Sequence, residues 1–95
     1  MENWECLKCF LAMGENDFRV SAEHISLFAI LISLHNGDIF EDALLIEPKQ
    51  IICRMRISYK TYRKYIKELH EFGYIRYYPS YDPKKNSEVF FVKWN

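Results

Sequence analysis

The feature that most restricts the fold is a helical pattern that ends at a glycine and is followed by two aromatic-rich runs. Apolar side chains recur every three or four residues from Ser58 to Gly73, which predicts an amphipathic helix capped by Ser58. Residues 74–79 and 88–94 are rich in β-branched and aromatic side chains. The segment between them, residues 80–87, contains the Asp, Pro, Asn and Ser that are typical of turns. We therefore predict a helix followed by a β-hairpin.

The first third of the chain predicts two more helices. Apolar residues recur at helical spacing over residues 3–13. Ser21 can cap a second helix over residues 22–35, which is apolar on nearly every side. We expect this helix to be central and buried. We also expect Asn36 and Gly37 to supply a left-handed residue that ends it.

A short strand and another helix complete the order of elements. Residues 43–47 are a short apolar stretch that predicts a strand, and Pro48 suits the start of a helix over residues 49–55, where its missing N–H is no loss. With the helix that starts at Ser58, this gives a helix-turn-helix pattern. The predicted fold class is α+β and mainly helical: a winged helix-turn-helix with an extra N-terminal helix and a C-terminal β-hairpin wing.

Length and composition indicate one domain over residues 1–95, with an N-terminal helix and connection (1–20) and a winged-helix core (21–95). The chain has 95 residues, of which 49% are hydrophobic and 17% aromatic, enough to bury a core. No apolar run is long enough for a membrane span, and the N-terminus does not resemble a secretory signal. We expect a cytoplasmic protein that makes no membrane contact. The three cysteines are expected to be reduced thiols.

The net charge of zero hides a strong segregation of charge along the chain. Residues 1–47 contain nine acidic and two basic residues, whereas residues 48–95 contain eleven basic and four acidic ones. Such asymmetry favours an anionic partner for the basic half, most often nucleic acid. The alternative is that the two halves neutralise each other in the fold.

The predicted helix from Ser58 places its positive charges on one face. At about 100° per residue, its apolar side chains fall on one side and its basic side chains on the other. We expect Arg63 to read guanine, because its guanidinium can donate to two acceptors at once. The predicted DNA contacts in the major groove are Tyr59, Lys60, Arg63 and Lys64; those to phosphates are Lys49, Arg56 and Lys67; those at the hairpin tip are Lys84 and Lys85.

The spacing of Ser58, Thr61, Tyr62, Ile66, Leu69, Gly73, Tyr74 and Ile75 resembles the recognition-helix-to-wing segment of bacterial winged-helix regulators. The stretches HISLF at His24 and TYRKYIKELHEFGYIRYYPSYDP at Thr61 are similar to small helix-turn-helix proteins of conjugative transposons and related mobile elements. The resemblance covers residues 21–94. It departs at Tyr62 and Tyr65, where smaller aliphatic residues are usual. It implies sequence-specific binding of double-stranded DNA, as a transcriptional regulator or as an excision or replication accessory.

Other chemistry has weaker support. Cys6 and Cys9 form half of a zinc motif, but the sequence holds no second close pair, so we expect a buried helix face and no metal or other cofactor. His70 lies beside acidic residues without a catalytic motif, so we expect no catalytic residues and no enzyme. The tyrosines of the predicted hairpin could stack on bases. We favour packing against a helix instead, for Tyr77 at least.

Two questions of partnership are left open by the sequence. The last strand is apolar on both faces, because Val89 and Phe91 alternate with Phe90, Val92 and Trp94. Either the N-terminal helix or a second subunit could cover the second face, so a homodimer through that helix or the C-terminal strand is one prediction. The alternative to DNA binding is a winged-helix protein-protein interaction module, whose basic face binds an acidic protein.

Overall fold

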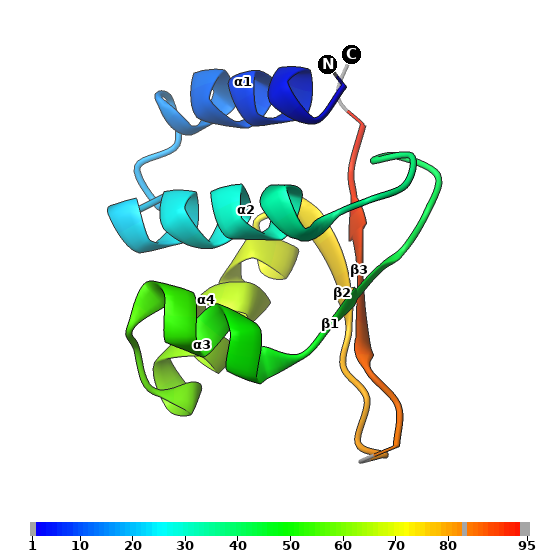
Figure 1. Cartoon of the computed structure of the whole chain (residues 1–95). Coiled ribbons are helices and arrows are strands. Elements are labelled where there is room, and N and C mark those ends of the chain that lie inside the picture. Colours follow the sequence, from blue (N-terminus) through cyan, green and yellow to red (C-terminus); the bar gives the residue numbers. More distant parts are fainter. Residues whose placement is uncertain (1, 83, 94–95) are drawn as a thin grey trace.

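The computed structural model describes residues 2–82 and 84–93, and its elements follow the predicted order. The helices are α1 (Glu2–Gly14), α2 (Ala22–Leu34), α3 (Pro48–Met55) and α4 (Tyr59–Glu71), and the strands are β1 (Leu44–Ile46), β2 (Ile75–Tyr78) and β3 (Ser87–Phe91). The prediction of a mainly helical α+β fold is confirmed. All four helices lie on the same side of the sheet (Figure 1).

The last strand in the sequence is the central strand of the sheet. The order is β1-β3-β2, and β3 is antiparallel to both neighbours. Val89 lies between Leu44 of β1 and Tyr77 of β2. The sheet therefore closes only when the carboxy-terminal hairpin pairs with a strand that precedes α3 and α4 in the chain.

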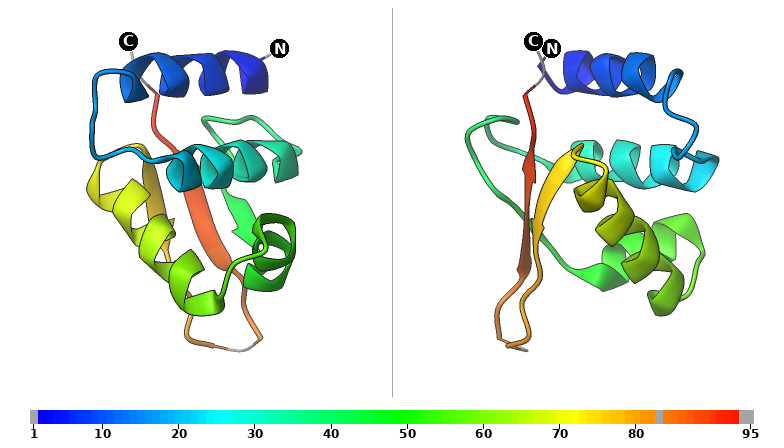
Figure 2. Two further views of the ribbon diagram at one scale, coloured as in Figure 1. Left: turned by 90° about the vertical axis from the view of Figure 1, so that its left-hand side faces the viewer. Right: turned by 180° about the vertical axis from the view of Figure 1, so that it is seen from behind.

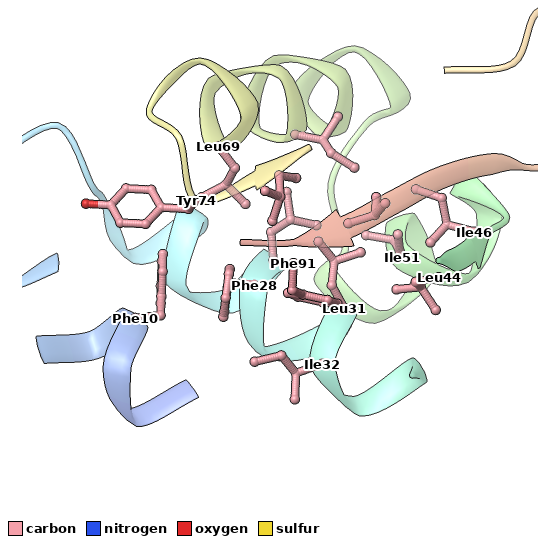
Figure 3. Packing of buried hydrophobic residues seen from close by; sticks show 14 of the residues in the cluster. Phe10, Phe28, Leu31, Ile32, Leu44, Ile46, Ile51, Leu69, Tyr74 and Phe91 are labelled. Carbon is pink, nitrogen blue, oxygen red and sulfur yellow. The ribbon is translucent and has the colours of Figure 1, made fainter. Parts of the chain in front are cut away.

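The core lies between the sheet and the helices, and α2 runs through its middle. Val89 and Phe91 of β3 are buried on the inner face of the sheet. The Phe91 ring meets Phe28 of α2 edge-on at 5.4 Å, and Phe28 stacks on Phe10 of α1 with 3.9 Å between ring centroids (Figure 3). Helix α1 lies across α2 on the side away from α3 and α4 (Figure 2). These aromatic contacts join α1 to the sheet through α2.

A buried histidine fixes the start of α2 against α4. The backbone N–H of Ser21, the predicted cap, donates to Nδ1 of His24 at 2.9 Å, so this nitrogen is an acceptor. The proton is therefore on Nε2, which lies 2.9 Å from Oε1 of Glu68 and donates to it. A polar link thus runs from the first turn of α2 to the carboxylate of Glu68 on α4.

The expected left-handed end of α2 is wrong. Among the described residues, positive φ angles occur at Arg56 and Gly73, and neither Asn36 nor Gly37 has one. Instead, α2 ends with His35 in an extended conformation, and the buried ring of this residue holds the loop. Its Nδ1 accepts from the Gly37 N–H at 3.1 Å, so Nε2 donates to the carbonyl oxygen of Asp42 at 2.9 Å.

The outer face of the sheet is partly exposed. Leu45 is 59% and Tyr78 51% exposed, and Phe90 is half-buried with the Tyr78 ring against it at 5.7 Å. Helix α1 packs on α2 and does not cover this face (Figure 1). Trp94 lies outside the described residues. The homodimer through α1 or β3 stays a prediction.

Replacing Phe10 by Ala should lower the free energy of unfolding by about 3–5 kcal/mol, because it empties a fully buried site in the aromatic stack. The matched control is Lys8→Ala on the exposed side of α1, which should change stability by about 0.5 kcal/mol or less. Urea unfolding followed by circular dichroism measures both. Equal effects of the two substitutions would show that α1 is not part of the core.

Candidate nucleic-acid interface

The turn between α3 and α4 sets the direction of α4. Arg56 ends α3 in the left-handed conformation, with φ 57° and ψ 47°, and its N–H donates to the Ile52 carbonyl at 2.8 Å. Ser58 then caps α4, because its Oγ accepts from the Thr61 N–H at 3.1 Å. The two helices are therefore joined by three residues whose backbone is held at both ends.

Helix α4 has one face in the core and one face in solvent. Tyr62, Ile66 and Leu69 are fully buried. Lys60, Lys64 and Lys67 are exposed, and Arg63 is half-buried. The apolar spacing read from the sequence thus predicts the faces of this helix correctly.

Tyr62, one of the positions at which the resemblance departs, is a large residue in the core. Its side chain is fully buried, and its hydroxyl makes no hydrogen bond of good geometry with the described residues. Burial raises the pKa of Tyr62 well above its usual range, and the neighbouring Tyr77 adds a smaller effect in the same direction. Tyr62 is therefore a neutral packing residue beneath the exposed face of α4.

The basic face of α4 is not neutralised by ion pairs. Within the described ranges 2–82 and 84–93, the salt bridges are Arg19–Asp17 and His24–Glu68. Lys64 instead lies 5.3 Å from the Tyr65 ring centroid of its own helix. Hydrogen bonds to its own backbone N–H and to Ser21 lower the pKa of Glu23, and Lys64 contributes less to that shift. Among the described residues, the acidic half of the chain thus makes no salt bridge to this face.

Two surface hollows bring most of the predicted contact residues together. A groove of about 530 Å³ lies between the start of α3, the first turns of α4 and the hairpin, and a shallower hollow of about 350 Å³ follows α4 itself. Arg56 and Lys84 are exposed but line neither of them. The groove contains Lys49, Tyr59, Arg63 and Lys85, and the hollow contains Tyr59, Lys60, Arg63, Lys64 and Lys67.

The hairpin loop has internal structure of its own. The Ser80 N–H donates to Oγ of Ser87 at 3.1 Å across the base of the loop. Asp82 accepts the Lys84 N–H on its carboxylate at 2.9 Å and the Lys85 N–H on its carbonyl at 3.0 Å. These bonds place the two lysines at the tip of the hairpin, as predicted.

The groove also contains residues that were not predicted as contacts. Tyr77, Pro79 and Tyr81 line it, and so do the acidic residues Glu47 and Asp82. The high tyrosine content of the hairpin was the available signal, but only the fold shows which tyrosines face α4. Tyr78 points to the outer face of the sheet instead.

The cysteines are split between core and surface. Cys6 is buried, as expected for the CLKC helix face, and burial raises its pKa to about 11. Cys9 and Cys53 are exposed, so the expectation of a buried CLKC face is wrong for Cys9. Across the described residues, no group of three or more His, Cys, Asp or Glu is arranged to hold a metal ion. Nor does any helix in this part of the chain have the length and apolar character to cross a membrane.

Comparisons with known proteins give no family assignment. No protein-family model, no curated protein and no solved structure matches the chain. The functional interpretation therefore depends on the geometry and charge of the chain itself.

Replacing Ser58 by Ala should destabilise the protein by about 1 kcal/mol, because the N–H of Thr61 loses its acceptor at the start of α4. Ser26→Ala on the exposed side of α2 is the control and should be nearly neutral. Chemical unfolding of both variants measures the difference. A Ser58 variant as stable as the wild type would mean that the cap does not hold the start of α4.

Proposed function

We propose that this chain is a winged helix-turn-helix domain that binds double-stranded DNA in a sequence-specific manner. The order of elements supports this assignment. Helices α3 and α4 are joined by three residues, and a hairpin of β2 and β3 follows. The second strand of this hairpin, β3, pairs with β1, which precedes α3 in the chain. In this assignment α4 is the recognition helix and the hairpin of β2 and β3 is the wing.

The observation that carries the proposal is the unpaired positive face of α4. Its four basic residues lie on the side opposite the core and take part in neither of the salt bridges of the described chain. DNA supplies closely spaced phosphates, and its major groove, about 12 Å wide, admits a helix. Tyr59, Lys60, Arg63 and Lys64 would enter the groove, and Lys49, Arg56 and Lys67 would contact phosphates. Lys84 and Lys85 of the wing would reach the adjacent backbone.

The resemblance to proteins of mobile elements supports a proposal for the biological role. We propose regulation of transcription, or an accessory role in excision or replication, at a site near the genes of such an element. A transcriptional regulator and an accessory protein differ in where their DNA sites lie. Selection of preferred duplexes from a random pool would identify the site and its half-site spacing.

The second candidate function is a module that binds protein. The exposed outer face of the sheet, with Leu45, Tyr78 and Phe90, favours it, because an apolar surface of this kind suits a protein partner. The two candidates use different surfaces. Substitutions on α4 and on the outer face of the sheet therefore distinguish DNA binding from protein binding.

Affinity for duplex DNA should fall steeply with salt, by about 0.9 log unit per log unit of salt for each phosphate contacted. The triple variant Lys60→Ala, Arg63→Ala, Lys64→Ala should lose most of this binding. The triple variant Lys8→Ala, Arg76→Ala, Lys93→Ala removes the same charge from other exposed surfaces and should retain most of it. Fluorescence anisotropy over a salt series measures all three proteins. A flat salt response, or equal losses in both variants, would contradict the proposal.

Arg63→Ala should weaken binding to the preferred duplex by about 1–3 kcal/mol and relax the preference at one base pair, because a bidentate contact to guanine is lost. Lys67→Ala should weaken binding to all duplexes alike. It should also reduce the slope of log affinity against log salt by about the value that one phosphate contact contributes. Competition with duplexes substituted at single positions distinguishes base reading from phosphate contact. An Arg63 variant with unchanged sequence preference would remove this residue from base recognition.

A further inference from the structure

The groove between α3, α4 and the hairpin has a chemical character that duplex binding through α4 does not require. Three tyrosines line it, Tyr59, Tyr77 and Tyr81, together with Pro79. Tyr59 is 53% exposed and Tyr81 84% exposed. Large aromatic surfaces left in water beside a concave site are typical of surfaces that a ligand covers.

The two exposed rings of the groove, Tyr59 and Tyr81, are supported by the protein rather than buried in the core. Tyr59 lies 6.0 Å from the Tyr62 ring beneath it, and the Arg63 guanidinium carbon lies 6.0 Å from the Tyr59 ring centroid. Tyr81 is carried on the hairpin loop, which is held by the hydrogen bond between Ser80 and Ser87. One aromatic residue thus comes from α4 and another from the hairpin loop.

The charges around these rings suit a phosphate. Lys49, Arg63 and Lys85 reach the groove from α3, α4 and the hairpin. Two acidic residues also line it, Glu47 and Asp82, and the carboxylate of Asp82 already accepts the Lys84 N–H. Cations beside exposed aromatic rings are the combination by which proteins bind unpaired nucleotides, through base stacking and phosphate contact.

We propose that this groove binds an unstacked nucleotide, with the base against Tyr81 and the phosphate near Lys49 and Lys85. Its volume of about 530 Å³ lies within the usual range for small-molecule sites. The proposal deepens the proposed function and rests on it, because the groove adjoins the recognition helix. It predicts that the protein prefers DNA with an unpaired flank to an intact duplex.

The test compares an intact duplex with the same duplex carrying a short single-stranded overhang, at one salt concentration, by fluorescence anisotropy. The overhang should tighten binding by about tenfold, since stacking of one base on an aromatic side chain contributes about 1–3 kcal/mol. A nucleoside monophosphate, tested separately by titration calorimetry, distinguishes a free nucleotide from a DNA strand as the source of the ligand.

Tyr81→Ala should remove the gain from the overhang and leave the affinity for the intact duplex unchanged, because the residue is not among the predicted duplex contacts. Tyr81→Phe should keep the gain, since it keeps a ring that can stack. Tyr78→Ala on the opposite face of the same hairpin is the matched control and should behave as the wild type. The exposure of Tyr81 keeps its variants folded, which circular dichroism checks.

The outcomes separate this proposal from the broader one. Salt-dependent duplex binding with no gain from the overhang, and no binding of the monophosphate, would overturn the nucleotide groove and leave DNA binding intact. A gain that survives in Tyr81→Ala would also overturn it. Binding of the monophosphate that is lost in Tyr81→Ala would support the groove and identify a free nucleotide as its ligand. Failure of every DNA probe would overturn the proposed function itself.

Discussion

Burial of the apolar face of α4 is the constraint on which the rest of the molecule depends. Tyr62, Ile66 and Leu69 are fully buried, so the helix cannot rotate without exposing them to water. Lys60, Lys64 and Lys67 are therefore held on the exposed side of the helix. The Ser58 cap and the left-handed Arg56 fix where the helix starts. Together these features present Lys60, Lys64 and Lys67 as an array on the exposed side of the helix.

Such an array has an energetic cost when no partner is bound. Lys60 and Lys64, and likewise Arg63 and Lys67, are spaced four residues apart, and each like-charge pair at that spacing destabilises a helix by about 0.2–0.5 kcal/mol. Neither described salt bridge relieves this repulsion. A polyanion placed along the face would relieve it while releasing its own counterions. Under the proposed function, DNA binding would therefore also stabilise α4.

The parts of the fold that were predictable are those decided by local pattern. The spacing of apolar residues in α4, its Ser58 cap and the alternation of buried and exposed residues along β3 each depend on a single element and its packing against the core. The end of α2 was not predictable, because the buried His35 ring bonds to Gly37 and Asp42 and so replaces the expected left-handed turn. The groove was not predictable either. It forms where three separate segments, the start of α3, the first turns of α4 and the hairpin, meet around one space.

The hairpin contributes to two surfaces that face different ways. Its loop places Tyr81 and Lys85 on the groove beside α4, whereas Tyr78 and Phe90 belong to the outer face of the sheet. Because the helices all lie on one side of the sheet, a ligand on α4 leaves the outer face free (Figure 1). A protein partner on the outer face would contact the same two strands that carry the loop. Under the proposed function, such a partner would therefore act on DNA binding through the hairpin rather than by blocking α4.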